Sequence, residues 1–492
     1  MSTAAQAPAT TFDSLDPATG EVVATHPVHD EAAVRAAVET ARGEAAWWAG
    51  LGFEGRRERL KAWNRLVVDR KDELATLMRR ETGKPQGDAE LEVALAIDHL
   101  AWASKNAARV LGRRRVPSGL LMVNQAASIA YKPYGVVGVI GPWNYPVFTP
   151  MGSIAYALAA GNAVVFKPSE YTPGVGEWLA STFREAVGRP VLQVVTGFGE
   201  TGGALCRAGV GKLAFTGSPA TGRRVMAACA ETLTPVVIEA GGKDALIVAE
   251  DADVAAAADA ALWGACGNAG QTCAGVERVY VHQAVYDEFL TELVDRATKV
   301  AAEPDGQVGP ITMPGQLEII RSHIEDALAL GGRALVGGAD AVGERFVQPT
   351  VLVDVPEHSR AVQEETFGPT MTVTKVRDDD EAVALANGTS YALGSTVFSK
   401  EHGMAIAERL RAGMTAINAV ITFAGVPELP FGGVGESGFG RIHGADGLRE
   451  FAYPHAIARQ RFKPAIKLTS FERGPREEKR LGKVVKALYG RG

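Results

Sequence analysis

The sequence has few cysteines and no pairing pattern among them. Its 492 residues contain only four, and none belongs to a CxxC motif or a histidine-rich cluster: Cys206, Cys229, Cys266 and Cys273. A disulfide scaffold and a zinc site are therefore not expected, and we predict no metal. So few thiols in a long chain fit a reducing compartment.

Long hydrophobic runs and an excess of positive charge are also missing. The longest apolar stretch, residues 153–166, is shorter than the roughly 20 residues that cross a bilayer. Neither Lys nor Arg precedes Arg35, although secretory and transit leaders need basic residues. We therefore expect a cytoplasmic protein without a transmembrane segment. The 57 acidic residues outnumber the 51 Lys and Arg, which argues against a nucleic-acid partner because nucleic-acid binders need a basic surface.

The pattern of apolar residues predicts helices first and mixed elements later. Residues 30–112 are helical in periodicity, with Asp30 as a plausible N-cap. Amphipathic stretches are expected around residues 56–81 and 88–111, with a break between them at Gly83-Lys-Pro85. From residue 128, short apolar strands alternate with helices, the first of which is expected over residues 152–160, and the pattern restarts after Gly242. This alternation is typical of βαβ units, so we predict an α/β fold with two Rossmann-like domains built on parallel sheets.

The last 37 residues differ in charge from the rest of the chain. Residues 456–492 contain eleven Lys or Arg and three Asp or Glu. The segment LGKVVKALY places Leu481, Val484, Val485 and Leu488 on one face of a short helix. The tail is either a solvated segment with a short packing helix or a contact for an acidic partner or a membrane surface. A nine-residue helix is marginal alone, which favours the first interpretation.

Two glycine-rich turns in the first predicted domain could hold a dinucleotide. Gly197-Phe-Gly199-Glu-Thr-Gly202 is a GxGxxG sequence between a strand and a helix. Phe215-Thr-Gly217-Ser218 has the same context and adds a hydroxyl donor. Such turns let the backbone approach a pyrophosphate, which the helix N-terminus attracts. One match is weak in a chain with 56 glycines, so both turns remain candidates.

Three further segments carry reactive or charged side chains. Lys167-Pro-Ser-Glu170 ends an apolar strand, and Glu170 could hold ribose hydroxyls and repel a 2′-phosphate, or form an ordinary surface ion pair with Lys167. Cys273 follows a turn of small residues and is a candidate nucleophile, whereas the other three cysteines fit helical cores. Glu239 follows the strand VVI and is either a base that activates water or a strand-end side chain in solvent.

Seven motifs in this order and at this spacing resemble the NAD(P)-dependent aldehyde dehydrogenase family. The resemblance runs from about Asp16 to about Phe451, and the set is far more specific than any one motif. The motifs are Gly141-Pro-Trp-Asn144-Tyr-Pro, Lys167-Pro-Ser-Glu170, Phe215-Thr-Gly217-Ser218 with Gly222, Glu239-Ala-Gly-Gly-Lys, Gly270-Gln-Thr-Cys273, Glu364-Glu365-Thr-Phe367-Gly-Pro, and Leu429-Pro-Phe-Gly-Gly-Val-Gly-Glu-Ser-Gly438.

The resemblance implies that a small-molecule aldehyde is oxidised to a carboxylic acid. The implied cofactor is NAD, with NADP as the alternative. Cys273 would form a thiohemiacetal, Asn144 would donate its amide to the oxyanion, and Glu239 would activate water to hydrolyse the thioester. The family places the GxGxxG turn beside the adenine and the pyrophosphate near Ser218. The implied cofactor positions are Trp143, Lys167, Ser169, Glu170, Gly199, Phe215, Gly217, Ser218, Gly241, Glu365 and Phe367.

The resemblance also implies a domain plan and self-association. Residues 1–120 and 134–242 would form the NAD-binding domain, and residues 243–425 the catalytic domain. Oligomerisation strands would occupy residues 121–133 and 452–465, followed by a basic tail over 466–492. Because exposed strand edges favour pairing, we expect a homodimer or homotetramer.

Two positions depart from the family's pattern. Ser153 stands where hydrolytic tetrameric members often carry a lysine, and Ile442 stands where they often carry a glutamate. Those two groups are thought to relay protons. Arg441-Ile-His443-Gly is more similar to the branch that acts on fatty and aromatic aldehydes.

Three other functions were weighed against hydrolytic aldehyde oxidation. A CoA-acylating dehydrogenase is disfavoured by Glu239, which CoA-dependent relatives usually lack. A catalytically inactive structural relative is disfavoured by the joint presence of Asn144, Glu239 and Cys273. A thiol hydrolase without a cofactor would leave Glu170 and the Gly217-Ser218 turn unexplained.

Overall fold

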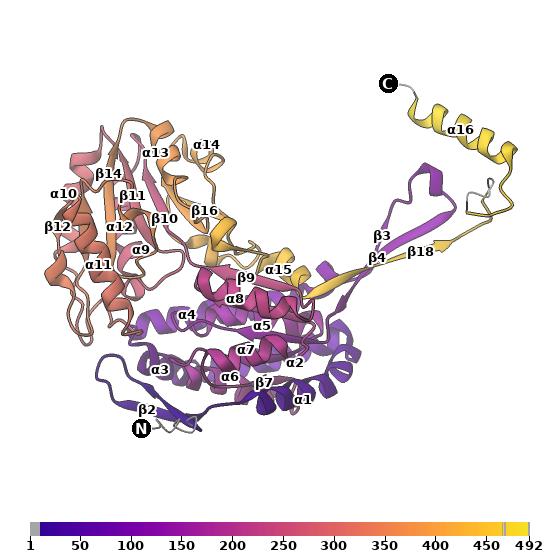
Figure 1. Ribbon diagram of the computed structural model, residues 1–492, viewed down its shortest axis with the longest axis horizontal. Helices are drawn as coiled ribbons and strands as arrows, with labels where there is room; N and C mark the ends of the chain where they lie inside the picture. Colours follow the sequence, from indigo (N-terminus) through magenta and orange to yellow (C-terminus); the bar gives the residue numbers. More distant parts are fainter. Residues whose placement is uncertain (1–9, 465, 467–468, 491–492) are drawn as a thin grey trace, which may run out of the picture. The chain divides into compact units, whose positions relative to one another are not determined.

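The computed structural model describes residues 10–464, 466 and 469–490, which form two compact units. The larger unit contains the chain up to Val110 and Pro133–Ala452, and the smaller unit contains Leu111–Lys132 and the chain from Tyr453 on. The helices and strands of each unit can be followed by their labels and colours in Figure 1. Within the described residues, no helix combines the length and the apolar character that crossing a bilayer requires.

A hairpin and four helices begin the larger unit. Asp30 caps the first helix as predicted, because its carboxylate accepts a hydrogen bond from Ala33 N at 2.8 Å. The amphipathic stretch expected around residues 56–81 is divided between two helices, because the chain leaves helical geometry at Arg70 (φ −114°, ψ 21°). The elements are β1 (Thr11–Leu15), β2 (Val22–Pro27), α1 (Glu31–Gly50), α2 (Gly52–Asp69), α3 (Lys71–Thr82) and α4 (Gln86–Leu111).

A six-stranded sheet in the order β17-β9-β8-β5-β6-β7 follows, parallel except for β17. Helix α1 packs on this sheet, and α2 packs against α6. The elements are β5 (Val136–Ile140), α5 (Phe148–Ala160), β6 (Ala163–Lys167), α6 (Pro173–Val187), β7 (Leu192–Val194), α7 (Gly199–Arg207), β8 (Lys212–Gly217), α8 (Pro219–Ala230), β9 (Val236–Ala240) and β17 (Gly438–Phe439).

The larger unit contains a second sheet of seven strands in the order β12-β13-β14-β11-β10-β15-β16. Only β12 is antiparallel to its neighbour, so the predicted α/β fold with two parallel sheets is confirmed. The strands are β10 (Asp244–Val248), β11 (Val276–His282), β12 (Arg333–Val336), β13 (Thr350–Val353), β14 (Thr370–Val376), β15 (Gly394–Phe398) and β16 (Met414–Ile417).

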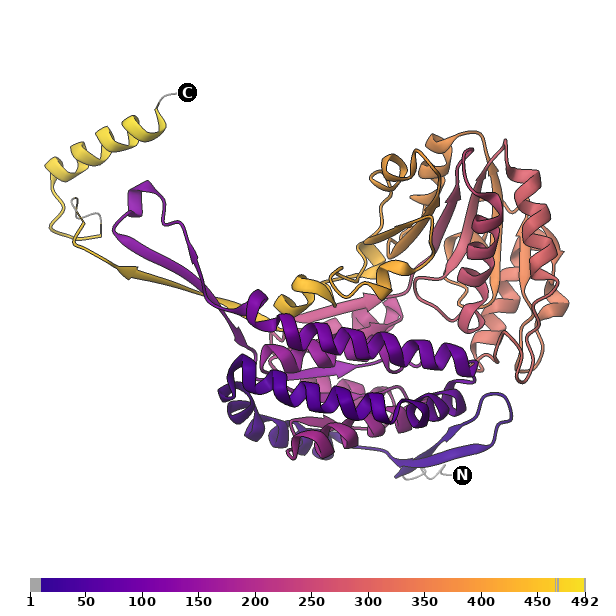
Figure 2. The same cartoon turned by 180° about the vertical axis from the view of Figure 1, so that it is seen from behind.

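Alternate residues of the central strand β10 face two different cores. Leu246 and Val248 pack with apolar residues of α9, α10 and α11, whereas Ala245 and Ile247 pack with residues of α13 and α14. Helices flank this sheet (Figure 2). Burial on both faces explains why the strand is a continuous apolar run. The helices are α9 (Val254–Cys266), α10 (Tyr286–Ala297), α11 (Gln316–Ala329), α12 (Arg360–Gln363), α13 (Asp379–Ala386), α14 (Gly403–Ala407) and α15 (Gly444–Glu450), with 3-10 turns η2 (Gly267–Gly270), η3 (Ala339–Ala341), η4 (Thr422–Gly425) and η5 (Gly435–Ser437).

The smaller unit has a three-stranded sheet in the order β18-β4-β3 and a C-terminal helix. The helix begins at Pro475, six residues before the predicted start. Proline suits the first helical position, and the Glu477 side chain accepts a hydrogen bond from Gly474 N at 3.2 Å. The elements are β3 (Arg114–Val116), η1 (Leu120–Met122), β4 (Gln125–Pro133), β18 (Ala452–Gln460) and α16 (Pro475–Tyr489).

Candidate active site

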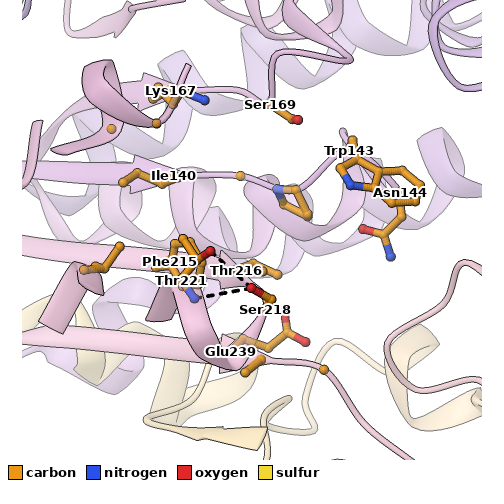
Figure 3. Close-up of a pocket in the computed structure, with 18 of the residues that line it drawn as sticks. Ile140, Trp143, Asn144, Lys167, Ser169, Phe215, Thr216, Ser218, Thr221 and Glu239 are labelled. Atoms are coloured by element: carbon orange, nitrogen blue, oxygen red, sulfur yellow. Dashed lines mark hydrogen bonds between the residues drawn. The ribbon is translucent and has the colours of Figure 1, made fainter. Parts of the chain in front are cut away.

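The strands β5, β6, β8 and β9 are parallel, so their carboxyl ends meet at one edge of the sheet. A cleft of about 740 Å³ opens at this edge (Figure 3). The structure brings all fourteen residues of the predicted site to the wall of this one cleft: Trp143, Asn144, Lys167, Ser169, Glu170, Gly199, Phe215, Gly217, Ser218, Glu239, Gly241, Cys273, Glu365 and Phe367.

The turn before Cys273 has an unusual backbone. Asn268, Ala269 and Gly270 have φ values of 53°, 56° and 69°, so three successive residues adopt the left-handed region. A Cβ on Gly270 would lie 2.1 Å from the backbone of Gly368, so only glycine fits. This strained turn directs the chain back toward the cleft, where Cys273 is partly exposed while the other three cysteines are buried.

Glu239 is a buried carboxyl at the end of β9. Only 3% of the residue is exposed, which rules out the solvent-facing alternative. No well-formed hydrogen bond from the described residues reaches either carboxyl oxygen. Burial raises the pKa of Glu239 to about 7, and the nearby Cys273 and Thr216 side chains partly offset that shift. Burial and the Glu239 charge together raise the pKa of the Cys273 thiol well above its usual value.

Asn144 is tied to the turn that carries Cys273. Its side-chain Nδ2 donates to the carbonyl oxygen of Gln271 at 2.9 Å. The backbone carbonyl oxygen of Asn144 accepts hydrogen bonds from Asn268 Nδ2 at 3.0 Å and from Lys84 Nζ at 2.8 Å. One N–H of the Asn144 amide is thus held in place, and the other can serve a ligand in the cleft.

Lys84 and Glu92 form a buried ion pair behind Asn144. Glu92 Oε1 also accepts from Val147 N and Phe148 N, at 2.9 and 3.0 Å, so it caps the start of α5. This cap explains why α5 begins at Phe148, earlier than the predicted start at Gly152. This ion pair was not predicted from the sequence. The sequence did contain a signal, because the Glu92 carboxylate interrupts a stripe of apolar residues on one side of α4. The buried apolar residues of that stripe are Ala89, Val93, Ala96 and Leu100.

The opposite part of the cleft lies between α7 and α8. Lys167 Nζ and Glu170 Oε2 are 3.5 Å apart, and burial lowers the pKa of Lys167. Ser218 caps α8, because its hydroxyl accepts from Thr221 N at 3.3 Å (Figure 3). Both glycine-rich turns therefore line the cleft through Gly199 and Gly217.

Arg207 on α7 and Arg224 on α8 also line the cleft and were missed. Both are exposed, and neither has an ion-pair partner within the part of the chain that the structure describes. An exposed arginine on an amphipathic helix is common, so the sequence contains no signal that separates these two from ordinary surface residues.

Glu365 and Phe367 reach the cleft on a loop from the other sheet. Glu365 Oε1 accepts from Gly242 N at 3.0 Å, and burial raises the pKa of Glu365 to about 8. A Cβ on Gly241 would lie 2.1 Å from that same oxygen, so the approach requires glycine. The Phe367 ring meets the Trp143 ring edge-on, with centroids 5.5 Å apart.

A second buried ion pair, Lys243 with Glu277, supports this loop. Glu277 accepts from Thr366 N at 2.9 Å and from Phe367 N at 3.1 Å. This arrangement is the same as that of Lys84 and Glu92: a carboxylate paired with a buried lysine accepts hydrogen bonds from two backbone N–H groups. It also stabilises Phe367 in a left-handed backbone conformation (φ 52°).

The geometry agrees with comparison to known proteins. A sequence model of the aldehyde dehydrogenase family matches residues 3–457. The chain belongs to the aldehyde dehydrogenase family.

Individual members of the family are similar over most of the chain. A 4,4′-diapolycopene aldehyde oxidase from Methylomonas sp. is 39% identical over 90% of this chain and 85% of its own length. A glutarate-semialdehyde dehydrogenase from Pseudomonas putida is 35% identical over 90% of this chain and 92% of its own length. The crystal structure of an NAD-dependent aldehyde dehydrogenase from Sinorhizobium meliloti superposes with a TM-score of 0.88 at 34% identity, covering 93% of each chain.

The two departures from the family's pattern both lie at α5. Ser153 and Ile442 are buried, and a Cβ on Gly152 would lie 2.8 Å from Ile442 Cδ1 and 2.6 Å from His443 Nε2. Burial lowers the pKa of His443 well below its usual value, so its ring is neutral. Uncharged groups therefore occupy the place where the family often has a lysine and a glutamate.

Replacing Lys84 tests the buried ion pair. Lys84→Met leaves the Glu92 carboxylate buried without a cation, and we expect the free energy of unfolding to fall by about 3–5 kcal/mol. Urea unfolding measures this change, and Lys61→Met is the control because Lys61 pairs with Glu58 on the surface, where a pair contributes less than about 1 kcal/mol. The double change Lys84→Met with Glu92→Gln should recover part of the loss. Equal stability of Lys84→Met and Lys61→Met would contradict the assignment.

Proposed function

We propose that this protein oxidises an aldehyde to a carboxylic acid, with NAD as hydride acceptor and water as acyl acceptor. The observation that carries the proposal is the meeting of the Cys273 thiol and the Glu239 carboxyl in one cleft, with the Asn144 amide held beside them. A nucleophile, a base and an oxyanion donor in one place are what acyl transfer through a thioester requires.

The cleft fits a dinucleotide. Gly199, Gly202, Gly203 and Gly217 leave its wall open to a flat ligand, and the N-terminus of α8 at Ser218 offers N–H groups to a phosphate. Glu170 and Lys167 would hold the adenine ribose, and Glu365 with Phe367 would hold the nicotinamide end. When bound, NAD would accept the hydride that leaves the aldehyde carbon.

Cys273 would attack the aldehyde carbon, and its proton must leave because only the thiolate is a strong nucleophile. Glu239, with a pKa of about 7, is half ionised near neutral pH and can accept that proton. The free N–H of the Asn144 amide would donate to the oxygen that becomes negative. Loss of the hydride leaves a thioester on Cys273. After Glu239 has released the thiol proton to solvent, it would take a proton from the attacking water, and the Cys273 thiolate would leave as the carbon–sulfur bond breaks.

In this proposal each sheet has a separate role. The six-stranded sheet with its surrounding helices binds the dinucleotide, and the seven-stranded sheet carries Cys273 on the turn after α9. The three-stranded sheet of the smaller unit would join copies of the chain through its exposed strand edges.

Cys273→Ala should abolish NADH formation, with a loss of at least about 1,000-fold in turnover, because no other side chain replaces the thiol. NAD affinity, measured by quenching of tryptophan fluorescence, should stay within about threefold of the parent value. Cys266→Ala, which removes a buried thiol outside the cleft, is the matched control and should remain active. Turnover by Cys273→Ala would remove this residue from the mechanism.

Glu239→Gln should separate the two half-reactions. A rapid burst of NADH should persist, while the steady-state rate falls by about 100-fold or more because water is no longer activated. In the parent enzyme the base is the ionised form, so the steady-state rate should rise with pH through the Glu239 pKa of about 7. Stopped-flow absorbance from pH 6 to pH 8 measures both effects (a range of about one unit on each side). An unchanged steady-state rate would reject the role of Glu239.

Glu170→Gln should narrow the preference for NAD over NADP. The change removes a carboxylate that would bind the ribose hydroxyls and would repel a 2′-phosphate, so the ratio of kcat/KM for the two cofactors should fall by about tenfold. The control is Glu185→Gln, because Glu185 pairs with Arg70 outside the cleft. If the ratio does not move in Glu170→Gln, the ribose contact is absent.

A further inference from the structure

The smaller unit concentrates the positive charge of the chain. Residues 111–132 and 453–492 contain 15 Lys or Arg and 3 Asp or Glu. The remainder of the chain contains 36 Lys or Arg and 54 Asp or Glu, so the two units have opposite net charge. A basic unit on an acidic protein is a surface for an anionic partner.

The same unit exposes many large apolar side chains. It holds eleven of the twenty-six exposed large hydrophobic residues found in the described chain, although it is a small part of the sequence. Four of them are consecutive at the loop between β3 and β4, where Leu120 is 64% and Val123 is 57% exposed. Consecutive exposed apolar residues point to a binding surface, because scattered single ones are the norm on proteins.

Helix α16 combines both properties. None of its residues is buried. Leu481, Val484, Val485 and Leu488 recur every three or four residues and form an apolar face. Basic side chains occupy the opposite side with the same spacing: Arg476, Lys479, Arg480, Lys483 and Lys486. Glu477 and Glu478 lie in the first turn, on the side of Leu481 and Val485 rather than on the basic side. The Glu477 carboxylate accepts from Gly474 N at the helix N-terminus, so the apolar face begins one turn later, at Leu481.

We propose that the smaller unit binds an anionic lipid surface, with α16 lying in the plane of the interface. The apolar face would enter the boundary between headgroups and acyl chains, and the long basic side chains would extend to lipid phosphates. The Leu120–Val123 loop supplies a second apolar contact. A nucleic acid would satisfy the charge but not the apolar face, and lipid satisfies both.

The test uses the full-length protein and vesicles of defined composition. Cosedimentation is compared for phosphatidylcholine vesicles and for vesicles in which about a quarter of the lipid is phosphatidylglycerol, at about 50 and about 500 mM NaCl. We expect binding to the anionic vesicles, little binding to the neutral ones, and loss of most binding at high salt.

Two neighbouring substitutions separate the apolar face from simple charge. Leu488→Glu and Ala487→Glu add the same negative charge, but only Leu488 belongs to the apolar face. Leu488→Glu should weaken binding to anionic vesicles by about tenfold, and Ala487→Glu by less than about threefold. Both variants should oxidise a water-soluble aldehyde at the parent rate without vesicles, which shows intact folding independently of the lipid result.

Several outcomes would overturn the proposal. Absence of binding by the parent protein, or equal binding to neutral and anionic vesicles, would exclude an anionic lipid surface. Equal effects of the two substitutions would exclude insertion of the apolar face. If the parent protein does not bind vesicles and light scattering shows that Leu488→Glu dissociates an oligomer, a second copy of the chain covers the apolar face of α16. Tight binding of duplex DNA that both variants weaken equally would identify a nucleic-acid surface.

Discussion

The removal of carboxylates from water is the constraint on which the cleft depends. Glu239, Asp244 and Glu365 are all buried near Cys273, and burial raises each pKa to between about 7 and about 8. An isolated buried carboxylate is costly, and a fold keeps it only where the surrounding backbone is held firmly. Gly241 is required because a larger residue would collide with the Glu365 carboxyl, and Gly270 is required because its turn lies against the backbone of Gly368.

Two buried lysine–glutamate pairs provide that rigidity, one on each side of the cleft. Glu92 fixes the start of α5 and, through Lys84, the carbonyl of Asn144, while Glu277 fixes the loop that carries Phe367. Each pair orients backbone groups but adds little net stability, because the cost of removing both charges from water offsets much of their Coulombic attraction. Buried charged groups that do not line the cleft therefore position the segments of Asn144 and Phe367 at its wall.

Local patterns predicted the sheets, the Asp30 cap and the cleft segments around Lys167, Gly199, Ser218, Glu239 and Cys273, because each depends on neighbours in sequence. The remaining cleft positions, Trp143, Asn144, Gly241, Glu365 and Phe367, came only from the family resemblance. Contacts between distant segments were not predictable in this way. The start of α5 is set by Glu92, more than fifty residues earlier, and Lys84 was interpreted only as part of a break between helices. Arg207 and Arg224 have the appearance of surface residues until the two helices that carry them are placed side by side.

The charges around Cys273 have one sign. Glu239, Glu365 and Asp244 all raise the pKa of its thiol, and burial adds to the same effect. A thiol in such surroundings stays protonated and weakly reactive at neutral pH. A ligand that brings positive charge to this end of the cleft would oppose all three carboxylates at once and lower the thiol pKa. In the proposed mechanism, the acidic surroundings would therefore make the reactivity of the partly exposed Cys273 sulfur depend on what the cleft has bound.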